Sequence, residues 1–232
     1  MVNKSLGQHW LKNRAILDEI ADLTGSGALC IEIGPGLGTL TSSLLKRFEK
    51  VLAIEFDAKL AANLPKSFPG KNLEVKNEDI LKFDFSTVPT PYFVAGNIPY
   101  YITSPIVEKL LLAPNLPERI VLLMQKEVAE RICDDKESML SLFVKNRAVP
   151  SLGPVVLRSE FEPAPKVDSQ VLILEPLEAP KYPDEIFKII KMAFRNPRKK
   201  LKHSIPNIPE KYANLRPENL HLDDYYAIMS LC

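Results

Sequence analysis

Four consecutive residues, Asn97-Ile-Pro-Tyr100, combine two hydrogen-bond acceptors, a proline and an aromatic ring. An exocyclic ring amine is a poor nucleophile because its lone pair is delocalised into the ring. The Asn97 side-chain oxygen and the Ile98 carbonyl can each accept one N–H bond, which favours a pyramidal nitrogen with a free lone pair. Pro99 fixes the turn and has no N–H to compete, and Tyr100 offers a flat face for a flipped-out base, a contact worth about 1–3 kcal/mol. The segment predicts methyl transfer to an exocyclic base nitrogen; an Asn-Pro turn beside a core tyrosine is the structural alternative.

A glycine-rich turn, Gly34-Pro-Gly-Leu-Gly38, follows the apolar run 28–33. Its glycines, Gly34 and Gly36 first among them, let the backbone pass close beneath a ligand that a side chain would block. The GxGxG spacing, preceded by the acidic Glu32, favours a nucleoside without a pyrophosphate over a dinucleotide. Such a loop alone is weak evidence, so a turn without any ligand remains the alternative.

Two carboxylates follow the next two predicted strands. Glu55 closes the second strand, 21 positions after Gly34, where a carboxylate can accept hydrogen bonds from both ribose hydroxyls. Asp79 follows the third strand and is placed to accept from an adenine amino group. The ends of three successive predicted strands, at Gly34, Glu55 and Asp79, can therefore contact the same nucleoside. With a methyl sulfonium as the group donor, this set predicts S-adenosylmethionine as cofactor and S-adenosylhomocysteine as its product.

The segment from Phe161 to Ser169 places a second aromatic residue on a loop stiffened by prolines. We expect Phe161 to form the other wall of the base pocket. A structural aromatic residue beneath the loop is the alternative. Lys166, in the same segment, is expected to meet a phosphate.

The pattern between these motifs alternates short apolar runs with amphipathic segments, which predicts an α/β fold with a Rossmann-like parallel sheet. The strands are expected at 28–33, 51–55, 73–76, 92–96 and 119–124, and the helices at 39–48, 60–68, 106–112 and 126–133. Residues 155–157 and 170–174 are expected to form a closing antiparallel pair. After a proline-rich linker the pattern becomes helical, at 184–194 and near 223–231. We therefore expect a catalytic domain at 1–177 and a small helical domain at 178–232.

Composition limits the possible classes of protein. The formal net charge is +1, so a case for a nucleic-acid partner depends on where the cations lie. Cys30, Cys133 and Cys232 form no CxxC pair, which argues against a disulfide framework or a zinc site. No apolar run is long enough to span a bilayer, and the first residues lack the apolar core of a signal peptide. We expect a metal-free cytoplasmic protein with no membrane association.

One segment, residues 195–202, concentrates positive charge and is called the basic segment below. It contains no acid, and its five cations are Arg195, Arg198, Lys199, Lys200 and Lys202. Such local density is what phosphate binding requires, so the segment is predicted to bind RNA. A solvated helix face is the alternative.

Taken together, these motifs resemble the ribosomal RNA adenine N6-dimethyltransferase family over nearly the whole chain. The matching segments are residues 6–11, 32–41, Glu55, Asp79, 97–100, 125–128 and 161–169. The resemblance implies that His9 and Leu11 help to cover the cofactor and that Gly34 lies beneath it. It also implies that Glu55 holds the ribose and Asp79 the adenine. Asn97 would then hold the methyl acceptor.

The resemblance further implies a substrate: two adjacent adenosines near the 3′ end of small-subunit ribosomal RNA, each dimethylated within a pre-ribosomal particle. Nothing in the sequence demands more than a monomer. His9 stands where the family often has Asn, residues 134–142 lack a glycine- and aromatic-containing segment, and the C-terminal domain is shorter than usual.

Two other functions remain open. The sister group that methylates large-subunit RNA and confers macrolide resistance shares the fold and the catalytic loop, although residues 193–201 and 216–220 look more like the small-subunit enzymes. A ribosome-assembly factor that acts without turnover is the other alternative.

Overall fold

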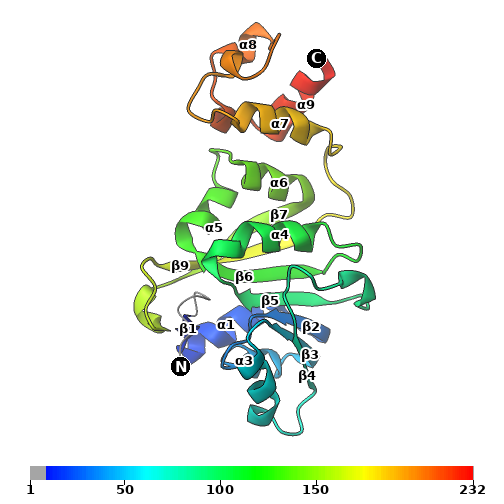
Figure 1. Ribbon diagram of the computed structural model, residues 1–232, viewed down its shortest axis with the longest axis vertical. Helices are drawn as coiled ribbons and strands as arrows, with labels where there is room; N and C mark the ends of the chain where they lie inside the picture. Colours follow the sequence, from blue (N-terminus) through cyan, green and yellow to red (C-terminus); the bar gives the residue numbers. More distant parts are fainter. Residues whose placement is uncertain (1–8, 232) are drawn as a thin grey trace. The chain divides into compact units, whose positions relative to one another are not determined.

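The structure is a computed structural model that describes residues 9–231. The first part of the N-terminal motif, residues 6–8, and Cys232 lie outside the described residues. The chain divides into two compact units (Figure 1), each described by itself below. Within the described residues, the first unit comprises 9–129 and 151–176, and the second comprises 130–150 and 177–231.

The central sheet has seven strands in the order β4-β3-β2-β5-β6-β9-β7 (Figure 1). Their bounds are β2 Gly27–Ile33, β3 Phe48–Glu55, β4 Leu73–Asn77, β5 Phe93–Asn97, β6 Arg119–Gln125, β7 Ala148–Val156 and β9 Ser169–Pro176. The pairs among β2 to β6 are parallel, and β9 runs antiparallel to β6. The predicted α/β fold with a Rossmann-like sheet is confirmed. Because the parallel strands share a direction, their carboxyl ends meet at one edge of the sheet.

The helices of the first unit follow the strands that they connect. They are α1 Arg14–Thr24, α2 Thr41–Leu44, α3 Ala58–Asn63, α4 Thr103–Leu111 and α5 Lys126–Cys133, of which the last turn of α5 belongs to the second unit. Asn13 caps α1 by accepting from the backbone N–H groups of Ala15 and Ile16, and Asp57 caps α3 in the same way. Helix α1 was not predicted from the sequence.

The predicted helix 39–48 was wrong at its C-terminal end. The α-helical part stops at Leu44, and Phe48 begins β3 by pairing with Gly27 of β2. The Phe48 ring is 5% exposed and packs in the core of the first unit with Leu17 and Leu44. Burial of this ring in the sheet layer outweighs the local helical spacing of residues 45–48.

Gly96 allows the ends of β2 and β5 to approach closely. A Cβ atom at this position would lie 2.8 Å from the carbonyl oxygen of Ile33, a distance that real Cβ atoms do not tolerate. Gly96 therefore allows the glycine-rich turn, which follows Ile33, and the segment 97–100 to begin at the same point of the sheet edge.

The second unit is helical. Its helices are α6 Met139–Arg147, α7 Ile186–Phe194, α8 Glu210–Ala213 and α9 Leu222–Leu231. They enclose a separate core that includes Ile190, Leu201 and Tyr225. Residues 130–150 also belong to this unit. The two domains predicted from the sequence, 1–177 and 178–232, placed that segment in the first domain. No helix within residues 9–231 combines the length and the apolar character that crossing a bilayer requires.

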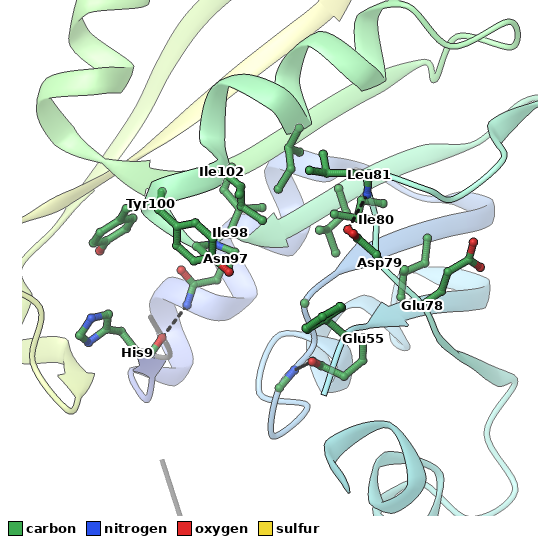
Figure 2. Close-up of a pocket in the computed structure, with 18 of the residues that line it drawn as sticks. His9, Glu55, Glu78, Asp79, Ile80, Leu81, Asn97, Ile98, Tyr100 and Ile102 are labelled. Atoms are coloured by element: carbon green, nitrogen blue, oxygen red, sulfur yellow. Dashed lines mark hydrogen bonds between the residues drawn. The ribbon is translucent and has the colours of Figure 1, made fainter. Parts of the chain in front are cut away.

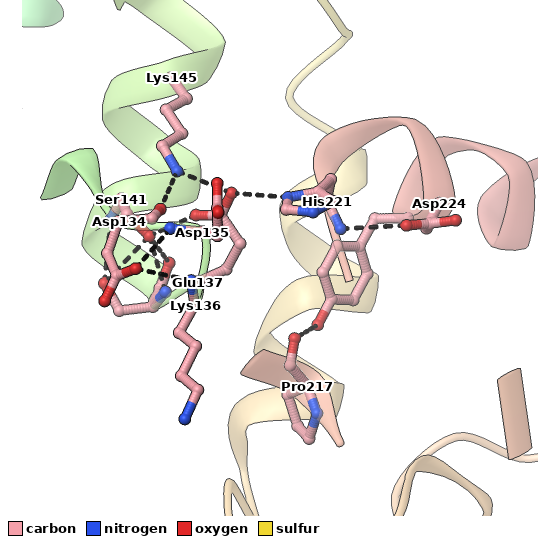
Figure 3. A network of polar contacts seen from close by, with 11 residues as sticks. Asp134, Asp135, Lys136, Glu137, Ser141, Lys145, Pro217, His221 and Asp224 are labelled. Atoms are coloured by element: carbon pink, nitrogen blue, oxygen red, sulfur yellow. Dashed lines mark hydrogen bonds and ion pairs between the residues drawn. The ribbon is translucent and has the colours of Figure 1, made fainter. Parts of the chain in front are cut away.

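A buried carboxylate ties the start of α6 to the C-terminal helix within the second unit (Figure 3). Glu137 is 2% exposed and accepts hydrogen bonds from Lys145 Nζ at 2.9 Å and from the Ser141 hydroxyl at 2.6 Å. His221 Nδ1 lies 3.1 Å from the same carboxylate. The backbone N–H of Glu137 also donates to the carbonyl of Glu218. A buried charge with this many partners is satisfied, and it fixes residues 134–142 against the segment before α9.

Candidate active site

A cavity of about 240 Å³ opens at the carboxyl ends of β2, β3, β4 and β5 (Figure 2). Nine of the predicted catalytic and cofactor residues line it: His9, Gly34, Gly36, Glu55, Asp79, Asn97, Ile98, Pro99 and Tyr100. They come from several segments between residues 9 and 100 of the chain. Parallel strand order therefore assembles residues that are distant in sequence into one site.

The glycine-rich turn forms the floor beside β2. Gly34 and Gly36 have φ angles of +65° and +57°, a region that residues with a Cβ rarely adopt. A Cβ on Gly36 would also lie 3.0 Å from Nε1 of Trp10. The Gly36 N–H donates to Glu55 Oε2 at 3.0 Å. The turn is thereby held against the end of β3 with its backbone exposed to the cavity.

Glu55 closes β3 and is 6% exposed. Besides Gly36, the Asp57 N–H donates to its other oxygen at 2.8 Å. Burial raises the pKa of Glu55, an effect that these backbone hydrogen bonds oppose. A carboxylate offers about four lone-pair positions, so roughly two remain for the hydroxyl groups of a ligand.

Phe56, next to Glu55, also lines the cavity and is 62% exposed. Phe56 was not among the residues predicted from the sequence. An exposed aromatic ring is costly to leave in water and offers a flat face for a planar ligand. Its position directly after a strand-end carboxylate was a signal that the sequence did contain.

Asp79 follows β4 and its Oδ1 accepts from the Leu81 N–H at 2.9 Å. Among residues 9–231, no donor reaches Asp79 Oδ2 and no acceptor reaches the N–H of Ile80. Ile80 lines the cavity as well. One free acceptor beside one free donor matches the amino group and ring nitrogen on the Watson–Crick edge of an adenine.

Asn97 ends β5, and its Nδ2 donates to the backbone carbonyl of His9 at 2.8 Å. This bond fixes the orientation of the amide and leaves Oδ1 without a donor among the described residues. The Ile98 N–H donates to the carbonyl of Leu123 at 3.2 Å, which anchors the following turn. Two acceptors, Asn97 Oδ1 and the Ile98 carbonyl, are thus held rigidly at the cavity.

The Tyr100 ring is held from its hydroxyl end, which lies 2.7 Å from Ser169 Oγ. Burial raises the pKa of Tyr100, so the phenol stays neutral at physiological pH. With its hydroxyl group already hydrogen-bonded and neutral, Tyr100 has its ring face left to meet a ligand.

Two residues predicted at the site do not line this cavity. Phe161 is 5% exposed and belongs to the core of the first unit. It pairs with Leu11, itself 1% exposed, where the two-residue strands β1 (Trp10–Leu11) and β8 (Phe161–Glu162) run antiparallel. Strand alternation turns the Phe161 ring inward, and its expected role as a wall of the base pocket stays a prediction. Leu11 borders only a second, much smaller cavity of about 20 Å³.

Glu32 is buried beneath the glycine-rich turn and is 1% exposed. The hydroxyl of Thr41 donates to it at 2.6 Å. Burial raises the pKa of Glu32 to about 8. It does not line the main cavity but borders the small one, so it supports the turn from below.

The predicted RNA-binding residues are all exposed. Lys166 lies on the first unit, and the five cations of the basic segment lie on the second. Within the described part of the chain, none of these six forms an ion pair with an acid. Lys200 makes one long hydrogen bond, 3.4 Å, to Asn214. The basic segment therefore presents unneutralised charge.

Residues 9–231 contain no cluster of three or more His, Cys, Asp or Glu side chains suited to a metal ion.

The family model of ribosomal RNA adenine dimethylases matches residues 1–220. Ribosomal RNA small subunit methyltransferase A of Mycoplasma mycoides is 32% identical over 256 residues, covering 98% of this chain and 96% of that protein. The protein of the same name from Rippkaea orientalis is 40% identical, covering 90% and 85%.

Two solved structures are similar over almost their full length. A dimethyladenosine transferase from Plasmodium falciparum has a TM-score of 0.79 at 29% identity, covering 95% of this chain and 96% of that one. The 23S rRNA methyltransferase ErmE has a TM-score of 0.76 at 26% identity, covering 95% and 99%.

Proposed function

The chain belongs to the ribosomal RNA adenine dimethylase family, and from this premise we propose that it dimethylates N6 of two adjacent adenosines near the 3′ end of small-subunit ribosomal RNA. The donor is S-adenosylmethionine. The enzyme acts as a cytoplasmic monomer on a pre-ribosomal particle. One observation carries the proposal: a single cavity holds the acceptor segment 97–100 beside the strand-end carboxylates Glu55 and Asp79.

The cavity fits the nucleoside of S-adenosylmethionine. Glu55 has acceptor capacity left for the ribose hydroxyls, and Asp79 with the Ile80 N–H matches the polar edge of adenine. Phe56 offers a face for the adenine ring, and Gly36 lines the cavity without a side chain. When bound, the cofactor supplies an electrophilic methyl group on a positively charged sulfur.

The acceptor segment prepares the target amine. Asn97 Oδ1 and the Ile98 carbonyl hold the two N6–H groups, which draws the nitrogen lone pair out of conjugation and aims it across the cavity. Tyr100 positions the flipped-out base by stacking. No strong base is required, because N6 becomes cationic as it gains a methyl group and then releases its proton to solvent.

Small-subunit RNA is favoured over large-subunit RNA by the relatives. The two relatives described above, at 32% and 40% identity, are both named for the small subunit. ErmE, named for 23S RNA, is 26% identical. The exposed, unpaired cations of the basic segment support an RNA partner of either kind.

The test is transfer of radiolabelled methyl groups from S-adenosylmethionine to undermethylated small subunits, free small-subunit RNA and large-subunit RNA in parallel, followed by nucleoside analysis. Dimethyladenosine on small subunits alone is the expected result. Label on large-subunit RNA would assign the enzyme to the other branch. Bound cofactor without any transfer would favour an assembly factor that acts without turnover.

A further inference from the structure

Tyr100 reaches the cavity from a short 3-10 turn, Tyr100–Ile102, between β5 and α4. The Ile102 N–H closes the turn by donating to the carbonyl of Pro99 at 3.2 Å. Two side-chain torsions separate the Tyr100 backbone from its ring. The turn therefore sets where the side chain begins but not the direction in which the ring face points.

The direction of the ring is fixed at its far end by Ser169. The Tyr100 hydroxyl lies 2.7 Å from Ser169 Oγ, and among residues 9–231 neither hydroxyl has another hydrogen-bond partner. Ser169 is 0% exposed. Turning the Tyr100 ring away would therefore leave the Ser169 hydroxyl without a partner and out of reach of water, which is unfavourable.

The backbone of Tyr100 is held by a second buried hydroxyl. Thr103, the first residue of α4, is 4% exposed, and its Oγ1 donates to the Tyr100 carbonyl at 3.2 Å. Tyr100 is thus anchored at both of its ends by uncharged groups. These contacts restrict orientation and bring no new charge to the site.

Strand β6 is a common frame for two parts of the acceptor site. The Ile98 N–H donates to the carbonyl of Leu123 in this strand at 3.2 Å. Two residues further along, Gln125 pairs with Ser169, the first residue of β9, which holds the Tyr100 ring. Two residues of a strand span about 7 Å. The backbone acceptor and the aromatic ring are therefore tied to neighbouring points of one rigid element.

We propose that Ser169 is a positioning residue for the methyl-accepting base, which it aligns by holding the plane of the Tyr100 ring through the contact between the two hydroxyl groups. Ser169 does not line the cavity, so it acts through Tyr100 and does not touch the base. The inference rests on the proposed function, because it concerns the base that stacks on this ring. It also gives the segment from Phe161 to Ser169 a part in the acceptor site through its last residue.

The experiment is a double-mutant cycle that compares Ser169→Ala, Tyr100→Phe and the combined variant with the wild type. The kcat and the KM for undermethylated small subunits are measured by methyl transfer, and the Kd for S-adenosylmethionine by calorimetry. Ser43→Ala is the matched control, because Ser43 is another buried serine of the first unit and its hydroxyl donates to Asp18 at 2.7 Å. Urea unfolding followed by fluorescence of Trp10, the single tryptophan, selects conditions in which every variant is folded.

Each single change is expected to lower kcat about 3- to 10-fold, the range that one hydrogen bond contributes. Because both changes remove the same contact, the combined variant should lose no more than either single variant. The KM for small subunits should stay within about twofold of the wild type, since phosphate contacts supply most of the affinity for RNA. Cofactor Kd should be unchanged, and Ser43→Ala should keep the wild-type kcat. A contact that served folding alone would lower stability and leave the kcat of the folded protein unchanged.

A wild-type kcat in Ser169→Ala would overturn the inference while the proposed function stands. So would losses that multiply to about 10- to 100-fold in the combined variant, or a weaker cofactor Kd that accounts for the loss. A wild-type protein that does not methylate small subunits would instead overturn the proposed function, and the role of Ser169 with it.

Discussion

Replacing Glu32 with Gln should remove a specific pH dependence from the stability of the first unit. Glu32 is 1% exposed, and burial raises its pKa from about 4.5 to about 8. Between these values the folded protein keeps the proton and the unfolded chain has lost it. Because the folded state binds more protons in this range, stability should fall as pH rises from about 4.5 to about 8.

The size of the effect follows from the shift. One pKa unit corresponds to about 1.36 kcal/mol. From pH 5.5 to 7.5 the wild type should therefore lose roughly 2–3 kcal/mol that Glu32→Gln does not lose. The amide oxygen can still accept the hydrogen bond that Thr41 donates at 2.6 Å, so the variant keeps the local geometry. Glu55, whose pKa is also raised by burial, is present in both proteins, and its charge is one of the causes of the raised pKa of Glu32.

Urea unfolding followed by Trp10 fluorescence measures this difference at several pH values. Trp10 is the single tryptophan and belongs to the first unit, so the signal reports that unit. Glu74→Gln is the matched control, because Glu74 is largely exposed and pairs with Lys50 at the surface; its change should stay below about 1 kcal/mol. Parallel pH profiles for wild type and Glu32→Gln would refute the reasoning.

Three further predictions follow from the site and the second unit. Asn97→Ala should lower kcat by about 100- to 1,000-fold and leave cofactor affinity unchanged in calorimetry; weaker cofactor binding with turnover intact would contradict its role. Changing Arg198, Lys199 and Lys200 to Ala should reduce the salt slope of small-subunit binding by about 2–3, and an unchanged slope would remove the basic segment from the RNA site. Glu137→Ala should destabilise the second unit by roughly 3 kcal/mol, because it leaves the partly buried Lys145 without its charged partner. Faster hydrogen exchange in α6 and α9 is the readout, and unchanged protection there would show that the carboxylate is dispensable.

Much of the site could be predicted from the sequence because it lies at the ends of parallel strands. Apolar runs in the sequence predict those strands. Because parallel strands end at the same edge of a sheet, the residues that follow them lie close together, and Gly34, Glu55, Asp79 and Asn97 line one cavity. The chemistry proposed for the 97–100 segment also follows from residue type, since amide and carbonyl oxygens accept hydrogen bonds and a flat ring can stack wherever they are held.

Side-chain direction in short, distant pairings could not be predicted. Leu11 and Phe161 are separated by 150 positions (161 minus 11), yet their pairing in β1 and β8 decides which side chains turn inward. Because side chains alternate along a strand, a shift of one residue would reverse the outcome. The burial of Phe161, which is 5% exposed, was therefore not predicted from the sequence.

The sequence by itself determined that a parallel sheet forms and which chemical types gather at its edge, because periodicity and strand-end position are local properties. Tertiary structure alone decided which faces are buried. It turned the His9 ring toward Tyr100, put Glu32 beneath the glycine-rich turn and packed residues 130–150 with the C-terminal helices. Burial and orientation depend on contacts between residues far apart in the chain, and no local pattern encodes them.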